Sequence, residues 1–141
     1  MTYSADFWIW AAAMLLVLGL GGGAIALAAL RPLGRQVPFP QPVSTLSLVI
    51  SDAAQQQLQT GLRAYQTGRY GVAIDAFNRL IEREPSCAEA FHNRGLTHAN
   101  LGKTNLAVGD LVKAGELYDQ QRAKAGVDTV KAQLQQLAQR V

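Results

Sequence analysis

Two histidines, one cysteine and a few scattered carboxylates are the side chains with which metal or hydrolytic chemistry would begin. His92 and His98 are six residues apart, so on a helix they lie on nearly opposite sides and do not chelate one metal ion as an i, i+4 pair does. A hydrolytic site needs a nucleophile and a base that converge in a pocket, and the pattern around Cys87, Asp75 and Asp110 predicts none. The sequence therefore predicts a binding protein that is not an enzyme, without cofactor, metal ion or small-molecule substrate.

An uncharged, apolar run occupies residues 7–30, "FWIWAAAMLLVLGLGGGAIALAAL". As a helix it would span about 36 Å, against about 30 Å for the hydrocarbon core of a bilayer. We therefore expect one transmembrane helix there, preceded by a short tail, residues 1–6, on the non-cytoplasmic side. Gly19 and Gly23 are four residues apart, a spacing that lets another membrane helix approach closely.

Two other interpretations of this run are weaker. A cleaved secretory signal would begin with basic residues and have a shorter apolar stretch; only the small residues Ala26 and Ala28 fit a cleavage site. The letters "GLGGGA", residues 19–24, match part of a dinucleotide-binding fingerprint. That motif needs a preceding strand and an acidic residue about 20 positions on, and the sequence offers neither.

The charges that flank the run predict its orientation. Arg31 and Arg35 follow it directly, whereas only Asp6 precedes it, so the C-terminal part should face the cytoplasm or the stroma. Trp8 and Trp10 would then lie at the opposite interface. A single cysteine agrees with a reducing compartment.

Prolines dominate the next segment, residues 31–52, which holds Pro32, Pro38, Pro40 and Pro42. Proline disfavours regular helix and favours extended chain, so this segment predicts a stiff spacer. A short proline-rich ligand for an aromatic-lined groove is the less favoured alternative. The apolar stretch "STLSLVI", residues 44–50, is expected to pack on whatever follows.

The rest of the chain repeats itself with a period of 34 residues. Residues 54–87 laid over residues 88–121 superpose small and apolar residues at matching places. The pairs are Gly61 with Gly95, Leu62 with Leu96, Gly68 with Gly102, Ala73 with Ala107, and Phe77 with Leu111. Such self-similarity is typical of repeat proteins, in which each unit buries its apolar face against a neighbour.

Each unit is predicted to be a pair of antiparallel helices, 54–67 with 70–83 and 88–101 with 104–118. Gly68 and Gly102 would supply the left-handed residue that ends a first helix. Gly61 and Gly95, unfavourable inside a helix, indicate close packing beside Phe77 and Leu111. Pro85 would end the second helix of the first unit. Residues 122–141 predict a capping helix, for which Asp128 is a suitable first residue.

These features resemble the tetratricopeptide repeat (TPR), whose glycine, alanine and closing proline are visible in "GLRAYQTGRYGVAIDAFNRLIEREP", residues 61–85. The resemblance covers TPR 1, residues 54–87, and TPR 2, residues 88–121. Gln57 departs from it, since Phe91 supplies a large aromatic at the matching place. The resemblance implies an all-α fold: an α-solenoid of two helix hairpins with a capping helix, behind one transmembrane helix.

The same resemblance implies that the first helix of each unit lines a concave groove that binds a protein partner. The groove residues it implies are Gln55, Leu58, Leu62, Tyr65, Gln66, Glu89, His92, Leu96, Ala99 and Asn100. The TPR subgroup that binds C-terminal carboxylates has lysine and asparagine where this chain has Leu58 and Leu62, so that activity is not expected. The scattered basic residues do not predict nucleic-acid binding.

A short repeat domain behind a single membrane helix is similar in architecture to the small membrane-anchored TPR proteins of cyanobacteria and plastids that assist photosystem I assembly. That resemblance implies a thylakoid membrane protein that binds subunits of a photosystem at the bilayer and acts as an assembly or stabilising factor. A general membrane tether or adaptor, and a non-catalytic regulatory subunit of another membrane enzyme, stay open as alternatives.

Overall fold

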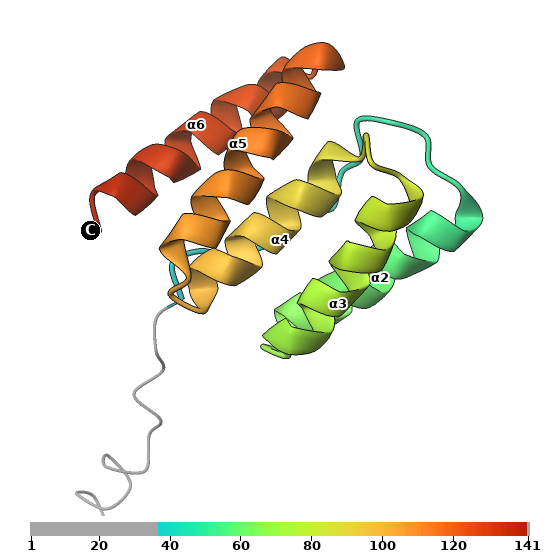
Figure 1. The fold of residues 1–141 in the computed structure, drawn as a ribbon, viewed down its shortest axis with the longest axis horizontal. Coiled ribbons are helices and arrows are strands. Elements are labelled where there is room, and N and C mark those ends of the chain that lie inside the picture. Colours follow the sequence, from blue (N-terminus) through green and yellow to red (C-terminus); the bar gives the residue numbers. More distant parts are fainter. Residues whose placement is uncertain (1–36, 141) are drawn as a thin grey trace, which may run out of the picture. The chain divides into compact units, whose positions relative to one another are not determined.

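The computed structural model describes residues 37–140, which contain five α-helices and no strand (Figure 1). The all-α prediction is confirmed for this part of the chain. The helices are α2 (Asp52–Gln66), α3 (Tyr70–Arg83), α4 (Ala88–Asn100), α5 (Thr104–Gln120) and α6 (Lys124–Ala138). The bounds of α2 to α5 agree with those expected from the sequence to within about two residues, the usual uncertainty of helix ends.

Each helix packs against its neighbours along the chain, so the helices form a stack in which α4 is central. α4 contacts α3 and α5 extensively and α2 more lightly. Within α4 only Phe91 and Arg94 are not fully buried. The terminal helices α2 and α6 each keep one largely polar, exposed side, as expected where a helix has a neighbour on one side only.

Three turns between helices share one hydrogen-bonding pattern, which is that of a Schellman motif. Gly68 and Gly102 have φ of +71° and +77°, the left-handed conformation predicted for them. In the first turn Gly68 N–H donates to Tyr65 C=O (3.0 Å) and Arg69 N–H donates to Ala64 C=O (2.8 Å). The third turn places Arg122 at the same position with φ of 57°, although arginine has no special preference for it.

The glycines inside α2 and α4 mark close packing between helices, as predicted. A Cβ added to Gly61 would lie 2.4 Å from Phe77 Cε1, far inside contact distance. A Cβ added to Gly95 would lie 3.1 Å from Asp110 Cβ, which is tight but less severe. Ala73 and Ala107, on the helices opposite, are fully buried. The absence of a side chain at Gly61 thus allows the Phe77 ring to fill the interface.

The prediction that α6 begins at Asp128 is wrong. α6 begins at Lys124, after Ala123, because the left-handed residue Arg122 reverses the chain directly after α5. Asp128 lies inside the helix and is exposed. α6 buries only Val130 and Leu137 fully, and Val127 and Leu134 in part, so one of its sides packs on α5 and the rest is polar.

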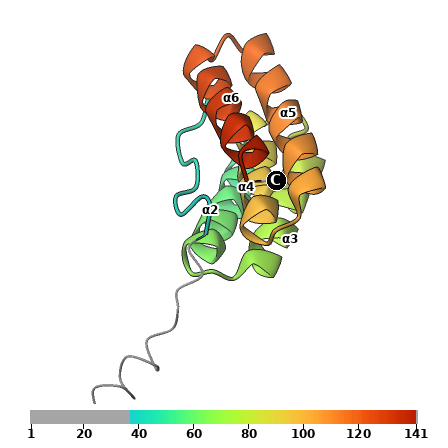
Figure 2. The same ribbon diagram turned by 90° about the vertical axis from the view of Figure 1, so that its left-hand side faces the viewer.

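Residues 37–50, which we call the strap, belong to the segment predicted as a stiff spacer and pack on the helices. The strap runs along one side of the helices, where Phe39 is 6% exposed and Val43, Leu46 and Ile50 are partly buried against the core (Figure 2). The expected packing of residues 44–50 on the repeats is thus confirmed for Leu46 and Ile50. Ser51 then caps α2 by accepting a hydrogen bond from Ala54 N–H.

Between residues 37 and 140 no helix combines the length and the apolar character that crossing a membrane requires. The apolar run at residues 7–30, with Gly19 and Gly23, lies outside the described residues.

Candidate peptide-binding groove

The residues expected to line a groove come together on facing sides of α2 and α4, and most of them are buried. The exposed fraction is 5% or less for Leu58, Leu62, Tyr65, Glu89, His92, Leu96, Ala99 and Asn100. Gln55 and Gln66, at the outer side of α2, are exposed instead. Three of the buried members are hydrogen-bonded to the strap: Tyr65 and Asn100 to Phe39, and Glu89 to Ser47.

Asn100, at the end of α4, binds both polar groups of the Phe39 backbone. Its Oδ1 accepts from Phe39 N–H (3.0 Å), and its Nδ2 donates to Phe39 C=O (2.8 Å). The Tyr65 hydroxyl donates to the same carbonyl and accepts from Asn100 Nδ2 (2.8 Å). Burial raises the pKa of Tyr65, so its hydroxyl keeps the proton that it donates.

Asn93, two turns earlier on α4, repeats this arrangement with Val43. Its Oδ1 accepts from Val43 N–H and its Nδ2 donates to Val43 C=O, both at 2.7 Å. Asn93 was not among the residues expected to line the groove. A signal was available: Glu89, Asn93 and Asn100 fall at i, i+4 and i+11, which places three polar side chains on one face of a helix.

Glu89, at the start of α4, completes the row. Glu89 Oε1 accepts from Ser47 N–H at 2.7 Å, and Cys87 Sγ donates to Glu89 Oε2 at 3.6 Å. The strap residues Phe39, Val43 and Ser47 are thus bound in turn by Asn100, Asn93 and Glu89, so the strap runs opposite in direction to α4. At each of the three positions the strap offers its backbone, so these hydrogen bonds to α4 do not depend on which side chains the strap carries there.

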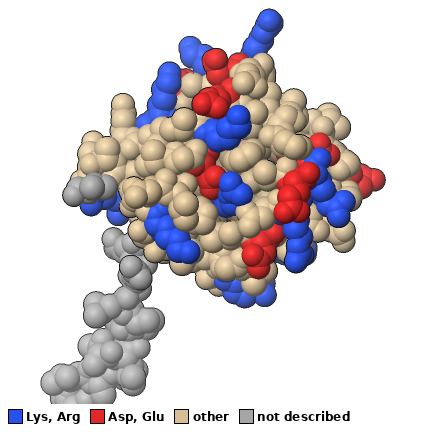
Figure 3. Space-filling view, viewed as in Figure 1, with Lys and Arg blue, Asp and Glu red and all other residues tan. Residues whose placement is uncertain are grey.

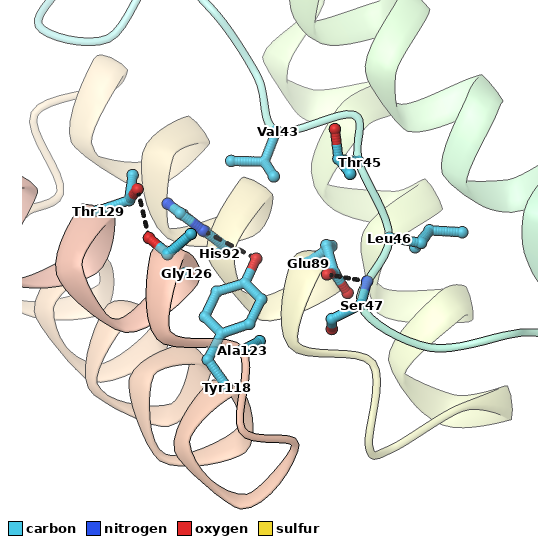
Figure 4. Close-up of a pocket in the computed structure, with 11 residues that line it drawn as sticks. Val43, Thr45, Leu46, Ser47, Glu89, His92, Tyr118, Ala123, Gly126 and Thr129 are labelled. Carbon is cyan, nitrogen blue, oxygen red and sulfur yellow. Dashed lines mark hydrogen bonds between the residues drawn. The ribbon is translucent and has the colours of Figure 1, made fainter.

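Between the strap and helices α4 to α6 lies a cavity of about 360 Å³ (Figure 4). Figure 4 shows Val43 and Ser47 of the strap on one side of it, with Glu89 and His92 of α4 and Tyr118 of α5 on the others. The residues that line it are Val43, Thr45, Leu46, Ser47, Glu89, His92, Tyr118, Ala123, Ala125, Gly126 and Thr129. The strap therefore covers this part of the groove without filling it.

His92 is held as a neutral ring at the edge of this cavity. Its Nε2 lies at 2.5 Å from Gln133 Oε1, an acceptor, so Nε2 carries the proton and Nδ1 accepts from the Tyr118 hydroxyl at 3.2 Å. Burial lowers the pKa of His92, although the bond to Gln133 and the charge of Glu89 oppose that shift. Both nitrogens are engaged, which leaves His92 without a free atom for acid or base chemistry.

His98 lies on another side of α4, beside an ion pair. Arg94 binds Asp110 through two nitrogens, Nε at 2.9 Å and Nη2 at 2.6 Å, and reaches Asn78 Oδ1 at 2.7 Å through Nη1. His98 Nε2 is 3.8 Å from Asp110 Oδ2, and burial lowers the pKa of His98. This cluster joins α3, α4 and α5, so its contacts are those of a structural link between the two units.

The other sequence candidates for chemistry are dispersed. Cys87 is fully buried, and burial raises its pKa to about 11, so it is a thiol at neutral pH. Within residues 37–140 no three side chains of histidine, cysteine, aspartate or glutamate come together as metal ligands. Figure 3 shows lysine and arginine interleaved with aspartate and glutamate on the face that it presents, without a continuous basic stripe there.

Comparison with known proteins gives no likeness from which a function follows: no family model, curated protein or solved structure matches this chain.

Proposed function

We propose that this chain is a membrane-anchored protein-binding module of the TPR type that acts as an assembly or stabilising factor for a membrane complex. Its client on this proposal is photosystem I, in the thylakoid membrane, with the helical domain on the cytoplasmic or stromal side. Residues 7–30 serve as the anchor, and the groove of α2 and α4 holds a segment of the client.

One observation carries the proposal: the groove already holds a non-helical segment of polypeptide. Asn93 and Asn100 each make two hydrogen bonds to the backbone of the strap, and Glu89 accepts one from Ser47 N–H. Side-chain amides that match the spacing of a peptide's donors and acceptors are a peptide-binding surface by chemistry, whichever chain supplies the peptide.

The anchor supports the choice of a membrane client. A groove on two hairpins buries limited area, so its affinity for one segment is modest. Confinement of both partners to one bilayer raises their effective concentration and makes a modest affinity sufficient. The choice of photosystem I rests on the architecture, an uncharged N-terminal run before a short helical repeat domain.

The experiment is co-purification from detergent-solubilised thylakoids with matched variants. Asn93→Ala with Asn100→Ala removes the amides that bind a backbone, whereas Gln59→Ala with Gln66→Ala removes two exposed amides at the matching positions of α2. We expect the first pair to lower the recovery of photosystem I about tenfold and the second pair to leave it unchanged. Deletion of residues 1–30 should also lower it.

Wild-type recovery with the Asn93 and Asn100 variants and with the deletion, together with normal accumulation of photosystem I in cells that lack the protein, would contradict the proposal. A general membrane tether or adaptor, or a regulatory subunit of another membrane enzyme, would then be the better function.

A further inference from the structure

The polar contacts between the strap and α4 are made through the strap's backbone, whereas Phe39 adds a nearly buried side chain; together they tell what kind of chain the groove accepts. The N–H groups of Phe39, Val43 and Ser47 all donate to side chains of α4, and two of the three residues also have their C=O bound. Backbone groups are common to every sequence, so another extended segment with the same spacing would satisfy the same partners. Such a segment needs a free N–H at the three bound positions.

The strap's prolines respect this requirement. Pro38, Pro40 and Pro42 lie next to Phe39 or Val43, whose N–H groups donate to α4. None of the prolines occupies a position whose N–H makes a hydrogen bond to α4. Proline has no N–H but favours extended chain before binding, which reduces the entropy lost when the chain is held straight. The groove therefore suits an extended, proline-containing segment with an apolar side chain at the place of Phe39, which is nearly buried.

The cavity beneath the strap shows that the strap is an imperfect ligand. About 360 Å³ stays unfilled beside Val43, with Tyr118, Ala123 and Gly126 on its apolar side and the polar Glu89 and His92 also lining it (Figure 4). An aromatic side chain at the place of Val43 would bury apolar surface that valine does not reach. A segment that carries such a residue would have an advantage over the strap in the same groove.

We infer that the strap is a built-in competitor, and that the groove's ligand is an extended client segment with bulky apolar side chains four residues apart. This rests on the proposed function, whose groove it specifies. The strap belongs to the same chain, so its effective concentration is of the order of millimolar. A dissolved peptide at micromolar concentration is therefore excluded, whereas a client in the same membrane reaches a comparable effective concentration and displaces the strap.

The test uses the full chain in lipid nanodiscs and a fluorescent peptide with the sequence of residues 36–48. Val43→Asp in the chain should free the groove, because a carboxylate at a partly buried position of the strap loses hydration. Val49→Asp is the matched control, since Val49 belongs to the same strap and is fully exposed. By fluorescence anisotropy, the peptide should bind the Val43→Asp chain about tenfold or more tightly than the wild type or the Val49→Asp chain.

Two further arms test the site and the side-chain preference. Adding Asn93→Ala to Val43→Asp should reverse the gain, because the peptide would lose its backbone partners. A peptide with phenylalanine at the place of Val43 should bind about fivefold or more tightly than the original one. Conversely, Val43→Phe in the chain itself should strengthen the strap and weaken binding of either peptide.

Equal binding to all chains would overturn the inference, as would peptide binding that ignores Asn93→Ala. Loss of helical circular dichroism in the Val43→Asp chain would also overturn it, because the strap would then be a permanent part of the fold. Particles with two copies that exchange straps would assign the groove to a second copy instead. If the peptides behave as expected and photosystem I does not co-purify, the inference stands and the proposed function fails; the reverse result rejects the inference alone.

Discussion

The two helix hairpins share a sequence pattern and differ in what their first helices do. The 34-residue period places Gln55, Gln59 and Gln66 of α2 at the positions of Glu89, Asn93 and Asn100 of α4. The three glutamines are exposed, whereas the three residues of α4 are buried and bind the strap. The same positions in the repeat thus carry a solvated surface in one unit and a row of backbone-binding groups in the other.

Place in the stack explains the difference. α4 has helices packed on both sides and the strap along its face, whereas α2 packs mainly on α3. A polar side chain on α4 therefore loses water and must have a partner, which is what makes its hydrogen bonds selective. A repeat pattern fixes which face of a helix points inward, and the neighbours of that helix decide whether a polar residue there is a ligand-binding group.

The largest difference in stability between the hairpins should come from their buried glycines. Gly61→Ala should lower the free energy of unfolding by about 1–3 kcal/mol, because its Cβ would overlap the buried Phe77 ring. Gly95→Ala should cost about 1 kcal/mol or less, since its contacts are looser. Gly71→Ala, on an open helix surface, should raise stability by up to about 1 kcal/mol. Denaturant unfolding of the three variants measures this order, and equal effects would refute it.

The second difference concerns the polar rows. Asn93→Ala should destabilise the domain by about 1–2 kcal/mol, because the Val43 N–H and C=O lose their partners in a partly buried place. Gln59→Ala, at the matching position of α2, should change stability by less than about 0.5 kcal/mol. The comparison between the hairpins fails if thermal melting shows the two variants to be alike.

The turns that follow α2 and α5 should respond in opposite directions. Gly68→Ala forces a left-handed conformation on alanine and should cost about 1 kcal/mol. Arg122→Gly relieves the same conformation and should gain about 0.5–1 kcal/mol. Melting temperatures of both variants provide the check. A loss of stability in Arg122→Gly would mean that contacts of the arginine side chain stabilise the fold by more than the left-handed conformation costs.

The smallest expected effect is a pH dependence that comes from His92, whose counterpart in α2 is the non-titrating Leu58. Burial lowers the pKa of His92 below 6.5, so near and below that pH the unfolded chain binds more protons than the folded one. Stability should therefore fall as the pH drops below about 6.5. His92→Gln should make this fall less steep, and His98→Gln should act in the same direction because its pKa is also lowered. Unfolding curves between pH 5 and 8 would show no change in slope if neither ring is held neutral.

The helices and their packing glycines followed from the sequence because they depend on local patterns. Gly68 and Gly102 are left-handed, and Gly61 faces Phe77, as the repeat spacing predicted. The binding of Phe39, Val43 and Ser47 to the helices did not follow, because it depends on side chains 26 or more residues away and the strap's own sequence shows no period. The groove face of α4 was predicted in outline, yet Asn93 was missed because its role needs the strap as partner.

The start of α6 was misplaced for a related reason. Asp128 is a good first residue by type, but the chain turns earlier, at Arg122. Arginine has no preference for the left-handed conformation, so nothing in the sequence indicated this turn. A helix-capping preference is worth only about 1 kcal/mol, and in the observed helix Gly126 lies directly against the buried ring of Tyr118.

The most direct measurement of the strap's place is hydrogen exchange of single backbone amides in the full chain. The N–H groups of Phe39, Val43 and Ser47 should exchange slowly, because each donates to a side chain of α4, whereas Val49 N–H should exchange at nearly the rate of unfolded chain. In an Asn93→Ala chain Val43 should lose its protection first. Equally fast exchange at all four amides would show that the groove stands empty and would contradict the account of a groove closed by its own chain.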